Sequence, residues 1–448
     1  MKITEKQFAI ASATSICGLL LIWVLPNTIA LRHLLLLIGC FSAIGLIKKN
    51  WSQFMRINIY FLPLFFLLGL FIWVLIHLTF FSLNPELEVS ELSGLWMRTF
   101  IGAIAGIGLA IALVKLSAVR KCFYVFLFST PIINLLAYGY ASYIKGALLS
   151  SDQFIWFLFT KIETAYFGCI AASIAVGNLI VLLKDPYWRN SQSSKFIFWL
   201  SGLLIVLLSA FIVGTKNGLA IVLGLCLLLV MTIIYNALKR FDKRKFLDLL
   251  IALSIICVLS LIWGQHKAQP NKGWGAILAD FKVGVDIDGN KQWQKLEGSI
   301  PTPINEFGNN AISSTYSRTA WATVGVRLIG LYPLGYGSIN SSFVGLLNEA
   351  KIEHENQGQT HSGWIDFGLA FGIPGLVLIF SIMLSIAYLG LKSRSSIALP
   401  WVIVCLALMP FGLIAEITWK QYFEATIFFL SLGATIVMLV SNPSRAPG

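Results

Sequence analysis

Charged residues are scarce in this sequence, because Asp, Glu, Lys and Arg together make up only 12% of its 448 residues. A soluble domain carries about 25% charged residues, so half of the usual charge is missing. Hydrophobic residues reach 57%, and the mean hydropathy is +0.80. So few polar side chains cannot cover a soluble globule of this size. The composition excludes a cytosolic enzyme, a disordered protein and a fibrous repeat, and it indicates a polytopic membrane protein.

Paired cysteines and a continuous basic face are also missing. The seven cysteines form no C-x-x-C pair and lie in or beside apolar runs, so we expect neither disulfides nor a zinc site. The net charge is +13, but Lys and Arg occur in short clusters between apolar runs. Such clusters are typical of loops at a membrane surface and not of a nucleic-acid-binding face, so nucleic acid is not an expected partner.

Uncharged stretches of membrane-spanning length recur along the chain. A helical crossing of the hydrocarbon core needs about 20 residues. Two stretches are shorter, but their flanking Arg and Lys side chains can reach the interface. The expected spans are Gln7–Leu31, His33–Ile47, Ile57–Phe81, Thr99–Val114, Cys122–Ile144, Thr164–Leu183, Phe196–Thr215, Asn217–Leu238, Leu249–Gln265, Phe367–Leu391, Ser395–Ala415 and Ala425–Ser444. The sequence therefore predicts an all-α polytopic membrane protein with about 12 transmembrane helices.

Alternate loops differ in their positive charge. With the N-terminus inside, the cytoplasmic segments hold 19 of the 33 basic residues. The short opposite loops hold only Arg32, Arg98, Lys145, Lys161, Lys216 and Lys420. The positive-inside rule therefore predicts that both termini are cytoplasmic. The first span carries no cleavage site, and we expect it to be retained as a signal anchor.

One segment between spans is much longer than the others. Residues 266–363 lie between the ninth and tenth spans, on the outer side in this topology. Loops this long are uncommon unless they carry function, so we expect the chemistry at this face. The predicted organisation is a nine-helix region at 1–265, an outer loop with active-site residues at 266–363 and a three-helix region at 364–448. Stretches such as Thr319–Leu331 are expected to form short helices on the membrane surface or over a cavity.

A single histidine opens a span from this loop. His361 is followed by a helix whose small residues and proline allow close packing and a kink: Gly368, Gly372, Pro374 and Gly375. Two interpretations remain open, an interfacial histidine that packs beside Trp364 and a catalytic base. Asp366 lies five residues further on and faces another direction on a helix, so no dyad with His361 is expected.

Three cations are candidates for binding phosphate. Arg318 and Arg327 lie among apolar neighbours in the loop, and Lys216 is the sole charge in a tight turn between two spans. Guanidinium groups suit bidentate phosphate binding, but each cation could instead extend to lipid headgroups. The two arginines are nine residues apart, about 180° on a straight helix, so their convergence would need a bend.

The Asp286-Ile287-Asp288-Gly289-Asn290 segment is similar to the D-x-D element of metal-dependent glycosyltransferases and to half of a calcium loop. The glycine and the later ligand position do not match calcium-loop spacing. A solvated turn is the better interpretation, and we expect no metal site and no cofactor.

In order along the chain, these motifs resemble the O-antigen ligase and polymerase superfamily. His361-Ser362 followed after nine residues by Gly372–Gly375 resembles the H-[NSQ]-x9-G-x-x-G signature of that family. Arg327–Leu331 is similar to its R-x3-L element, and Ser317-Arg318 with Pro333–Gly337 is similar to its large loop. The resemblance implies a C-type glycosyltransferase-like protein of the bacterial inner membrane, with the large loop and the active site facing the periplasm.

The family joins a glycan carried on undecaprenyl diphosphate to a sugar hydroxyl, which for ligases belongs to the lipid A–core oligosaccharide. The resemblance implies that His361 is the general base and that Arg318, Arg327 and Lys216 bind the diphosphate in place of a metal. Attack opposite the leaving group would invert the anomeric configuration. Members commonly carry arginine at the position of Lys216, and lysine keeps the charge but loses the bidentate fork.

Other functions remain open at this stage. An O-antigen polymerase would use a second lipid-linked glycan as acceptor, and a protein O-oligosaccharyltransferase would use a protein. The R-x3-L element favours the ligase. A lipid-glycan flippase or transporter is the alternative from another class, although such proteins usually show inverted repeats and midplane charges that are not evident here. Membrane lipids are expected partners in every case.

Overall fold

The computed structural model describes residues 3–55, 58–154, 161–184, 192–239, 276–295, 299–355, 358–418 and 421–441, with five isolated positions between 253 and 264. Helices account for the regular structure of these residues. They are α1 (Glu5–Ile22), α2 (Ile29–Lys49), α3 (Trp51–Phe54), α4 (Leu62–Phe80), α5 (Pro85–Glu91), α6 (Met97–Lys115), α7 (Ser117–Phe126), α8 (Ser129–Lys145), α9 (Ser151–Phe154), α10 (Lys161–Lys184), α12 (Ser193–Val213), α13 (Lys216–Lys239), α15 (Ile277–Val285), α16 (Ser313–Leu331), α17 (Ser342–Glu349), α18 (Gly363–Ser393), α19 (Leu399–Ile414) and α20 (Gln421–Val440).

The all-helical, polytopic class is confirmed. Among the described residues, 10 helical segments are long and apolar enough to cross a membrane, and α19 is a shorter apolar helix. These elements overlap the expected spans except Leu249–Gln265, most of which lies outside the described residues. The count of 12 spans therefore stays a prediction.

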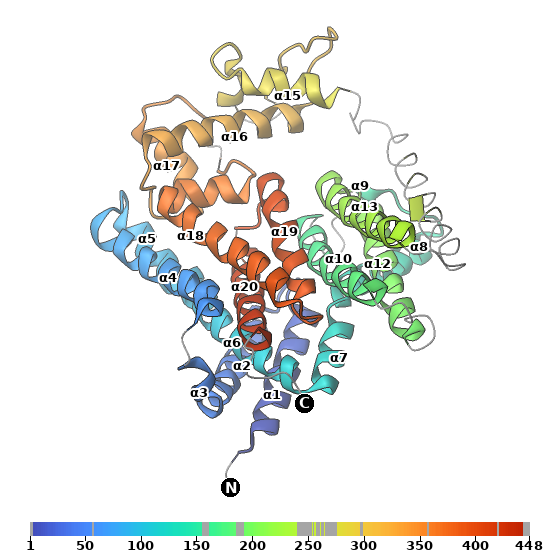
Figure 1. Cartoon of the computed structure of the whole chain (residues 1–448). Coiled ribbons are helices and arrows are strands. Elements are labelled where there is room, and N and C mark those ends of the chain that lie inside the picture. Colours follow the sequence, from blue (N-terminus) through green and yellow to red (C-terminus); the bar gives the residue numbers. More distant parts are fainter. Residues whose placement is uncertain are drawn as a thin grey trace.

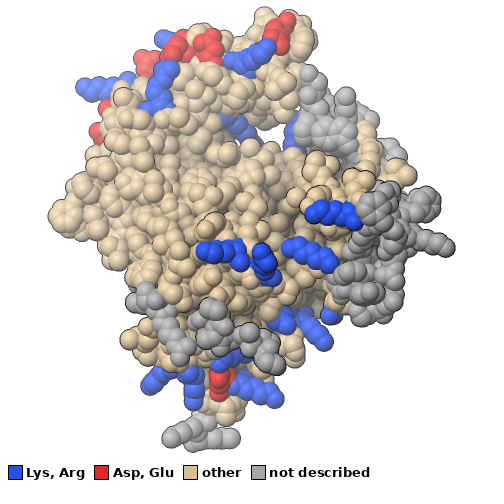
Figure 2. All heavy atoms as spheres, viewed as in Figure 1, with Lys and Arg blue, Asp and Glu red and all other residues tan. Residues whose placement is uncertain are grey.

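The start of α1 and the end of α20 lie at one end of the molecule, and α15, α16 and α17 lie at the opposite end (Figure 1). On the face in view, acidic side chains gather at the α15–α17 end, and no acidic side chain is visible across the middle of the molecule (Figure 2). This distribution agrees with the expected topology, in which both termini share one side and the long loop occupies the other. The assignment of these ends to cytoplasm and periplasm stays a prediction.

The membrane helices bury a continuous aromatic and aliphatic core. α6 packs against α20 and α2, while α10 packs against α12, α13 and α19. Trp23 at the end of α1 anchors part of this core, with its ring centroid 5.6 Å from those of Phe167 and Phe428. On the outside of the bundle, large apolar side chains such as Phe41 and Phe80 are exposed. Such exposure is expected where lipid replaces water as the solvent.

The long loop has a small core of its own beneath α16. Trp293, Tyr316 and Trp321 are buried together, and α17 contributes Phe343 and Leu346. Their polar groups are satisfied by the backbone, because Trp321 Nε1 donates to the Trp293 carbonyl (3.0 Å) and Tyr316 Oη donates to the Asn290 carbonyl (3.0 Å). The loop is therefore a folded cap, which fixes the direction in which α16 presents its side chains.

Helix α18 is broken at Gly372, and the loop fills the break. Gly372 has φ 65° and ψ −167°, and a Cβ atom there would overlap the Pro333 carbonyl. The Pro333–Gly337 segment supplies the missing hydrogen bonds: Tyr336 N–H donates to the Leu369 carbonyl (2.8 Å) and Gly337 N–H to the Ala370 carbonyl (2.8 Å). In return, Ile373 N–H donates to the Pro333 carbonyl (2.8 Å). Gly372 of the sequence motif thus allows the loop to approach α18 closely, and backbone hydrogen bonds then attach the loop to this membrane helix.

Candidate active site

His361 lies directly before α18, in a backbone conformation that is rare for a residue with a side chain. Its φ is 60°, which turns the chain sharply between Thr360 and the helix. The imidazole stacks on Trp321 of α16, with ring centroids 5.4 Å apart and planes inclined by 29°. One quarter of the His361 side chain remains exposed. The ring is therefore held firmly but stays accessible.

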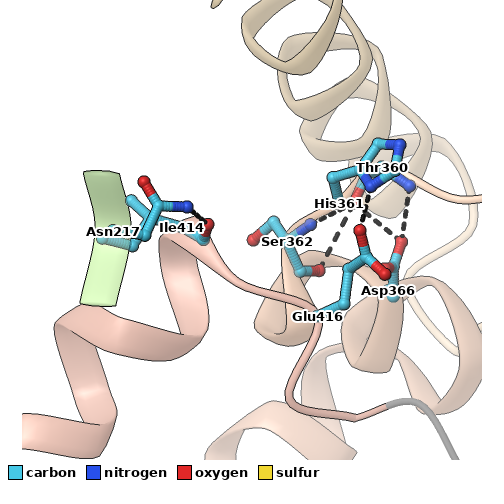
Figure 3. A network of polar contacts seen from close by, with 7 residues as sticks. All are labelled: Asn217, Thr360, His361, Ser362, Asp366, Ile414 and Glu416. Atoms are coloured by element: carbon cyan, nitrogen blue, oxygen red, sulfur yellow. Dashed lines mark hydrogen bonds and ion pairs between the residues drawn. The ribbon is translucent and has the colours of Figure 1, made fainter. Parts of the chain in front are cut away.

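Glu416 is the partner of His361. Its Oε1 is hydrogen-bonded to Nδ1 of the imidazole, and the side chain is only 7% exposed (Figure 3). The segment after α19 that carries Glu416 is fixed to the start of α18. Gly363 N–H donates to the Ala415 carbonyl (2.9 Å), and Thr418 Oγ1 donates to the Gly363 carbonyl (3.0 Å).

The charge state of Glu416 determines which nitrogen of His361 is available. Burial alone would raise the pKa of Glu416, but the hydrogen bond and charge of His361, together with the charge of Arg318, outweigh it and lower the pKa below its ordinary 4.5. An ionised carboxylate can only accept, so Nδ1 must be the donor. Whenever the imidazole is neutral, this hydrogen bond leaves Nε2 unprotonated, which is the form that a general base requires.

Asp366 shapes the turn before His361 and is not its hydrogen-bond partner. Its Oδ1 accepts from the Thr360 backbone N–H (2.9 Å) and from Thr360 Oγ1 (2.7 Å) (Figure 3). Trp364 lies elsewhere, because its Nε1 donates to the Met409 carbonyl (2.9 Å). The aromatic neighbour of His361 is Trp321, and the expectation that His361 packs beside Trp364 was wrong in this respect.

Two of the three candidate cations lie near this histidine. Asn217, which follows Lys216 at the start of α13, donates from Nδ2 to the Ile414 carbonyl two residues before Glu416 (Figure 3). The charge of Lys216 interacts with that of Arg318, and the charge of Arg318 interacts with Glu416. Arg318 lies three residues before Trp321 on α16, one turn from the residue on which His361 stacks.

Arg327 is held elsewhere. α16 continues without a break from Ser313 to Leu331, so Arg327 faces away from Arg318, as nine residues of helix require. Both of its Nη atoms donate to the Asp288 carboxylate at 2.8 Å. These hydrogen bonds lower the pKa of Asp288 and raise the pKa of Arg327. The structure thus brings together Lys216, Arg318 and His361, but does not bring Arg327 to them.

The Asp286–Asn290 segment is a turn, with Gly289 N–H donating to Asp286 Oδ1 (3.1 Å). Among the described residues, no three side chains of His, Cys, Asp or Glu come together as a metal-binding group.

Sequence reasoning missed Glu416. It lies 55 residues from His361, in a connection that has no recognisable motif. An acidic residue between two apolar helices, on the side where the loop is expected, was the only available signal.

A family model described as O-Antigen ligase matches residues 203–380. The matched range runs from α12 to beyond the break in α18 and includes Lys216, Arg318, Arg327 and His361, but not Glu416. None of the curated proteins matches the chain.

Proposed function

This chain belongs to the O-antigen ligase superfamily, and on that premise we propose that it transfers an O-antigen polysaccharide from undecaprenyl diphosphate to a sugar hydroxyl of the lipid A–core oligosaccharide. Transfer occurs at the periplasmic face of the bacterial inner membrane. The superfamily membership makes the protein a ligase- or polymerase-type glycosyltransferase, and the choice of donor and acceptor is our proposal.

The observation that carries the mechanism is the hydrogen-bonded pair of His361, just before α18, and Glu416, just after α19. Nε2 of His361 removes the proton from the acceptor hydroxyl, while Nδ1–H stays bonded to Glu416. The carboxylate then stabilises the imidazolium that forms. The acceptor oxygen bonds to the anomeric carbon as the bond from that carbon to the diphosphate oxygen breaks. Undecaprenyl diphosphate leaves, and the anomeric configuration is inverted.

The leaving diphosphate develops negative charge, which must be stabilised in the transition state. Lys216 and Arg318 lie near the base, since the charge of Arg318 interacts with both Lys216 and Glu416. Arg318 is exposed and Lys216 is half-buried. We infer that these two residues bind the diphosphate in the resting protein. Arg327 faces the other side of α16, so it can join them only if α16 bends or turns and a phosphate replaces the Asp288 carboxylate, to which it is bound at an exposed position.

The test is transfer from a synthetic undecaprenyl-diphosphate glycan to lipid A–core by purified full-length protein. His361→Ala should abolish transfer, because it removes the imidazole that takes the proton from the acceptor hydroxyl. His354→Ala is the matched control, because His354 is a second histidine of the same loop and bonds to Asn348 Oδ1 (3.0 Å). Near-normal transfer by folded His361→Ala would refute the general-base assignment.

The acceptor distinguishes a ligase from a polymerase. The same reaction run with a second lipid-linked glycan in place of lipid A–core should give no product. In cells, deletion of the gene should leave long-chain polymer on its lipid carrier. Accumulation of single repeat units would instead identify a polymerase and overturn the choice of acceptor.

A further inference from the structure

A second group of charges, Arg32, Arg98 and Glu424, lies where α2, α6 and α20 begin. The opposite ends of α2 and α6 show on which side of the bundle this group lies. Glu5, Asn50 and Lys115 hydrogen bond to one another at the end of the bundle near the termini. Asn50 follows the last residue of α2, and Lys115 ends α6. Arg32 and Arg98, in the first turns of the same two helices, therefore lie at the opposite end, the one expected to face the periplasm.

Arg98 is held in place by Glu424 at the start of α20. Its Nε donates to Glu424 Oε2 at 3.1 Å, and the arginine side chain is 34% exposed while that of Glu424 is 8% exposed. A single Nε contact leaves both Nη groups of Arg98 available. The buried carboxylate thus fixes the direction of a half-exposed guanidinium without occupying its fork.

Arg32 lies beside this pair and is incompletely satisfied. Its Nη1 donates to the Trp23 carbonyl (3.0 Å), but its buried Nε finds no hydrogen-bond partner among the residues that the structure describes. The charges of Arg32 and Arg98 interact with each other, and both interact with the charge of Glu424. The charge of Glu163 also interacts with Arg32. His33 is close enough to both arginines for their charges to act on it. The two carboxylates offset the repulsion between the arginines, but N–H donors of both guanidinium groups stay unused among the described residues, and leaving a buried donor unused is unfavourable.

We propose that Arg32 and Arg98 form a binding site for the phosphate group of a lipid. The carboxylates of Glu424 and Glu163 balance the two positive charges, so attraction at this site depends on directed N–H donors more than on net charge. A tetrahedral phosphate can accept from two guanidinium groups at once, whereas a carboxylate already occupies Arg98 Nε. The first turn of a membrane helix is also the depth at which lipid phosphates lie.

The position of the site suggests which lipid it serves. Glu424 lies eight residues after Glu416, and between them Thr418 bonds to Gly363 next to the catalytic turn. Gln421 at the start of α20 donates to Glu163 Oε1 (3.3 Å), which ties α20 to the first turn of α10. Under the proposed function, on which this identification rests, the phosphorylated sugars of lipid A would bind here while the donor diphosphate occupies Lys216 and Arg318.

Binding can be measured without transfer. Full-length protein in a maltoside detergent, which carries no phosphate, would be titrated with lipid A, with dephosphorylated lipid A and with phosphatidic acid, and bound lipid would be counted by native mass spectrometry. Arg98→Gln and Arg32→Gln should each weaken lipid A binding at least tenfold and leave dephosphorylated lipid A unaffected. Lys145→Gln is the control, because Lys145 is an exposed cation expected on the same side.

The arms separate the two sources of phosphate. A loss confined to lipid A assigns the site to the acceptor, and an equal loss for phosphatidic acid assigns it to membrane phospholipid; both outcomes support a phosphate site. If a glutamine variant fails to fold, Arg98→Lys and Arg32→Lys provide the answer, since lysine keeps the charge but loses the guanidinium fork and should still weaken lipid A binding. Unchanged lipid A binding in the folded Arg98→Gln and Arg32→Gln variants, or in the folded lysine variants where glutamine does not fold, would overturn the proposal. Repeating the titration in His361→Ala keeps this result independent of whether transfer occurs.

Discussion

Replacing Glu416 with glutamine removes one negative charge from the His361 pair while preserving size and a hydrogen-bond acceptor. The carboxylate is 7% exposed, so solvent screens its interaction with the imidazolium only weakly. A hydrogen bond to a charged group contributes about 1.5–3 kcal/mol. If about 2–3 kcal/mol of this stabilisation is lost in the transition state, kcat should fall roughly 30- to 150-fold. The amide can also turn its NH2 group toward Nδ1, which would favour the wrong tautomer and enlarge the effect.

The assay is transfer at saturating donor and acceptor, with wild type and Glu416→Gln at matched folded concentration. Glu88→Gln is the control, because Glu88 is equally buried and pairs with Nδ1 of His77 at 3.0 Å in the same way, but away from the site. Glu88→Gln should lose stability and retain kcat once folded. Wild-type kcat in Glu416→Gln would refute the role of the carboxylate in catalysis.

A stability measurement tests the charge of Glu416 separately. Its pKa in the folded protein is lowered from 4.5, so ionisation favours the folded state. The carboxylate therefore contributes stability above pH 4.5, and this contribution is lost as the pH falls through the lowered pKa. The difference in thermal unfolding temperature between wild type and Glu416→Gln should be largest at neutral pH and shrink below pH 4.5. A constant difference would mean that the carboxylate is not the source of the stability.

Five substitutions and one reagent test the rest of the site and the break in α18. Arg318→Lys should lower donor-dependent transfer about tenfold, because a lysine cannot form two parallel hydrogen bonds, whereas Lys216→Arg should be tolerated and Lys216→Ala should weaken transfer. Wild-type rates in all three would reduce these residues to lipid anchors. Asp288→Asn should release Arg327 from its ion pair and lower the KM for the donor, and this decrease in KM should become smaller at high salt. An unchanged KM would mean that Arg327 does not bind the donor. Gly372→Ala should destabilise the protein by about 1–3 kcal/mol or more, since it combines strain at positive φ with overlap of the Pro333 carbonyl, and an unchanged unfolding temperature would contradict the described break. Transfer should survive EDTA, and a strict requirement for magnesium or calcium would direct attention to Asp286 and Asp288.

The sequence alone was sufficient to predict an all-helical membrane protein, because hydropathy and charge indicate directly which segments lie in the bilayer. Apolar runs of spanning length and loops of opposite charge content follow from the cost of burying charge in hydrocarbon. The same reasoning could foresee the kink in α18 and the half-turn between Arg318 and Arg327, since both follow from local helix geometry.

The catalytic pair could be foreseen only in part. His361 was visible because its motif is local, but its partners Glu416 and Trp321 come from two other segments of the chain. Their meeting depends on how α16, α18 and α19 pack, which periodicity does not specify. The Arg327–Asp288 pair was invisible for the same reason, because it joins a turn to a helix 39 residues further along the chain.

The break at Gly372 also limits how substrates can enter. Three backbone hydrogen bonds join Pro333–Gly337 to α18, and their loss would expose peptide groups at membrane depth, where water cannot replace them. A hinge at this seam would therefore be strongly disfavoured, and the cap cannot swing open from this side. The donor and acceptor lipids must therefore reach the site laterally from the bilayer. They would pass between neighbouring helices with their acyl or prenyl tails still in the membrane. The packing of neighbouring membrane helices, and not the motion of a lid, would then determine where each lipid enters.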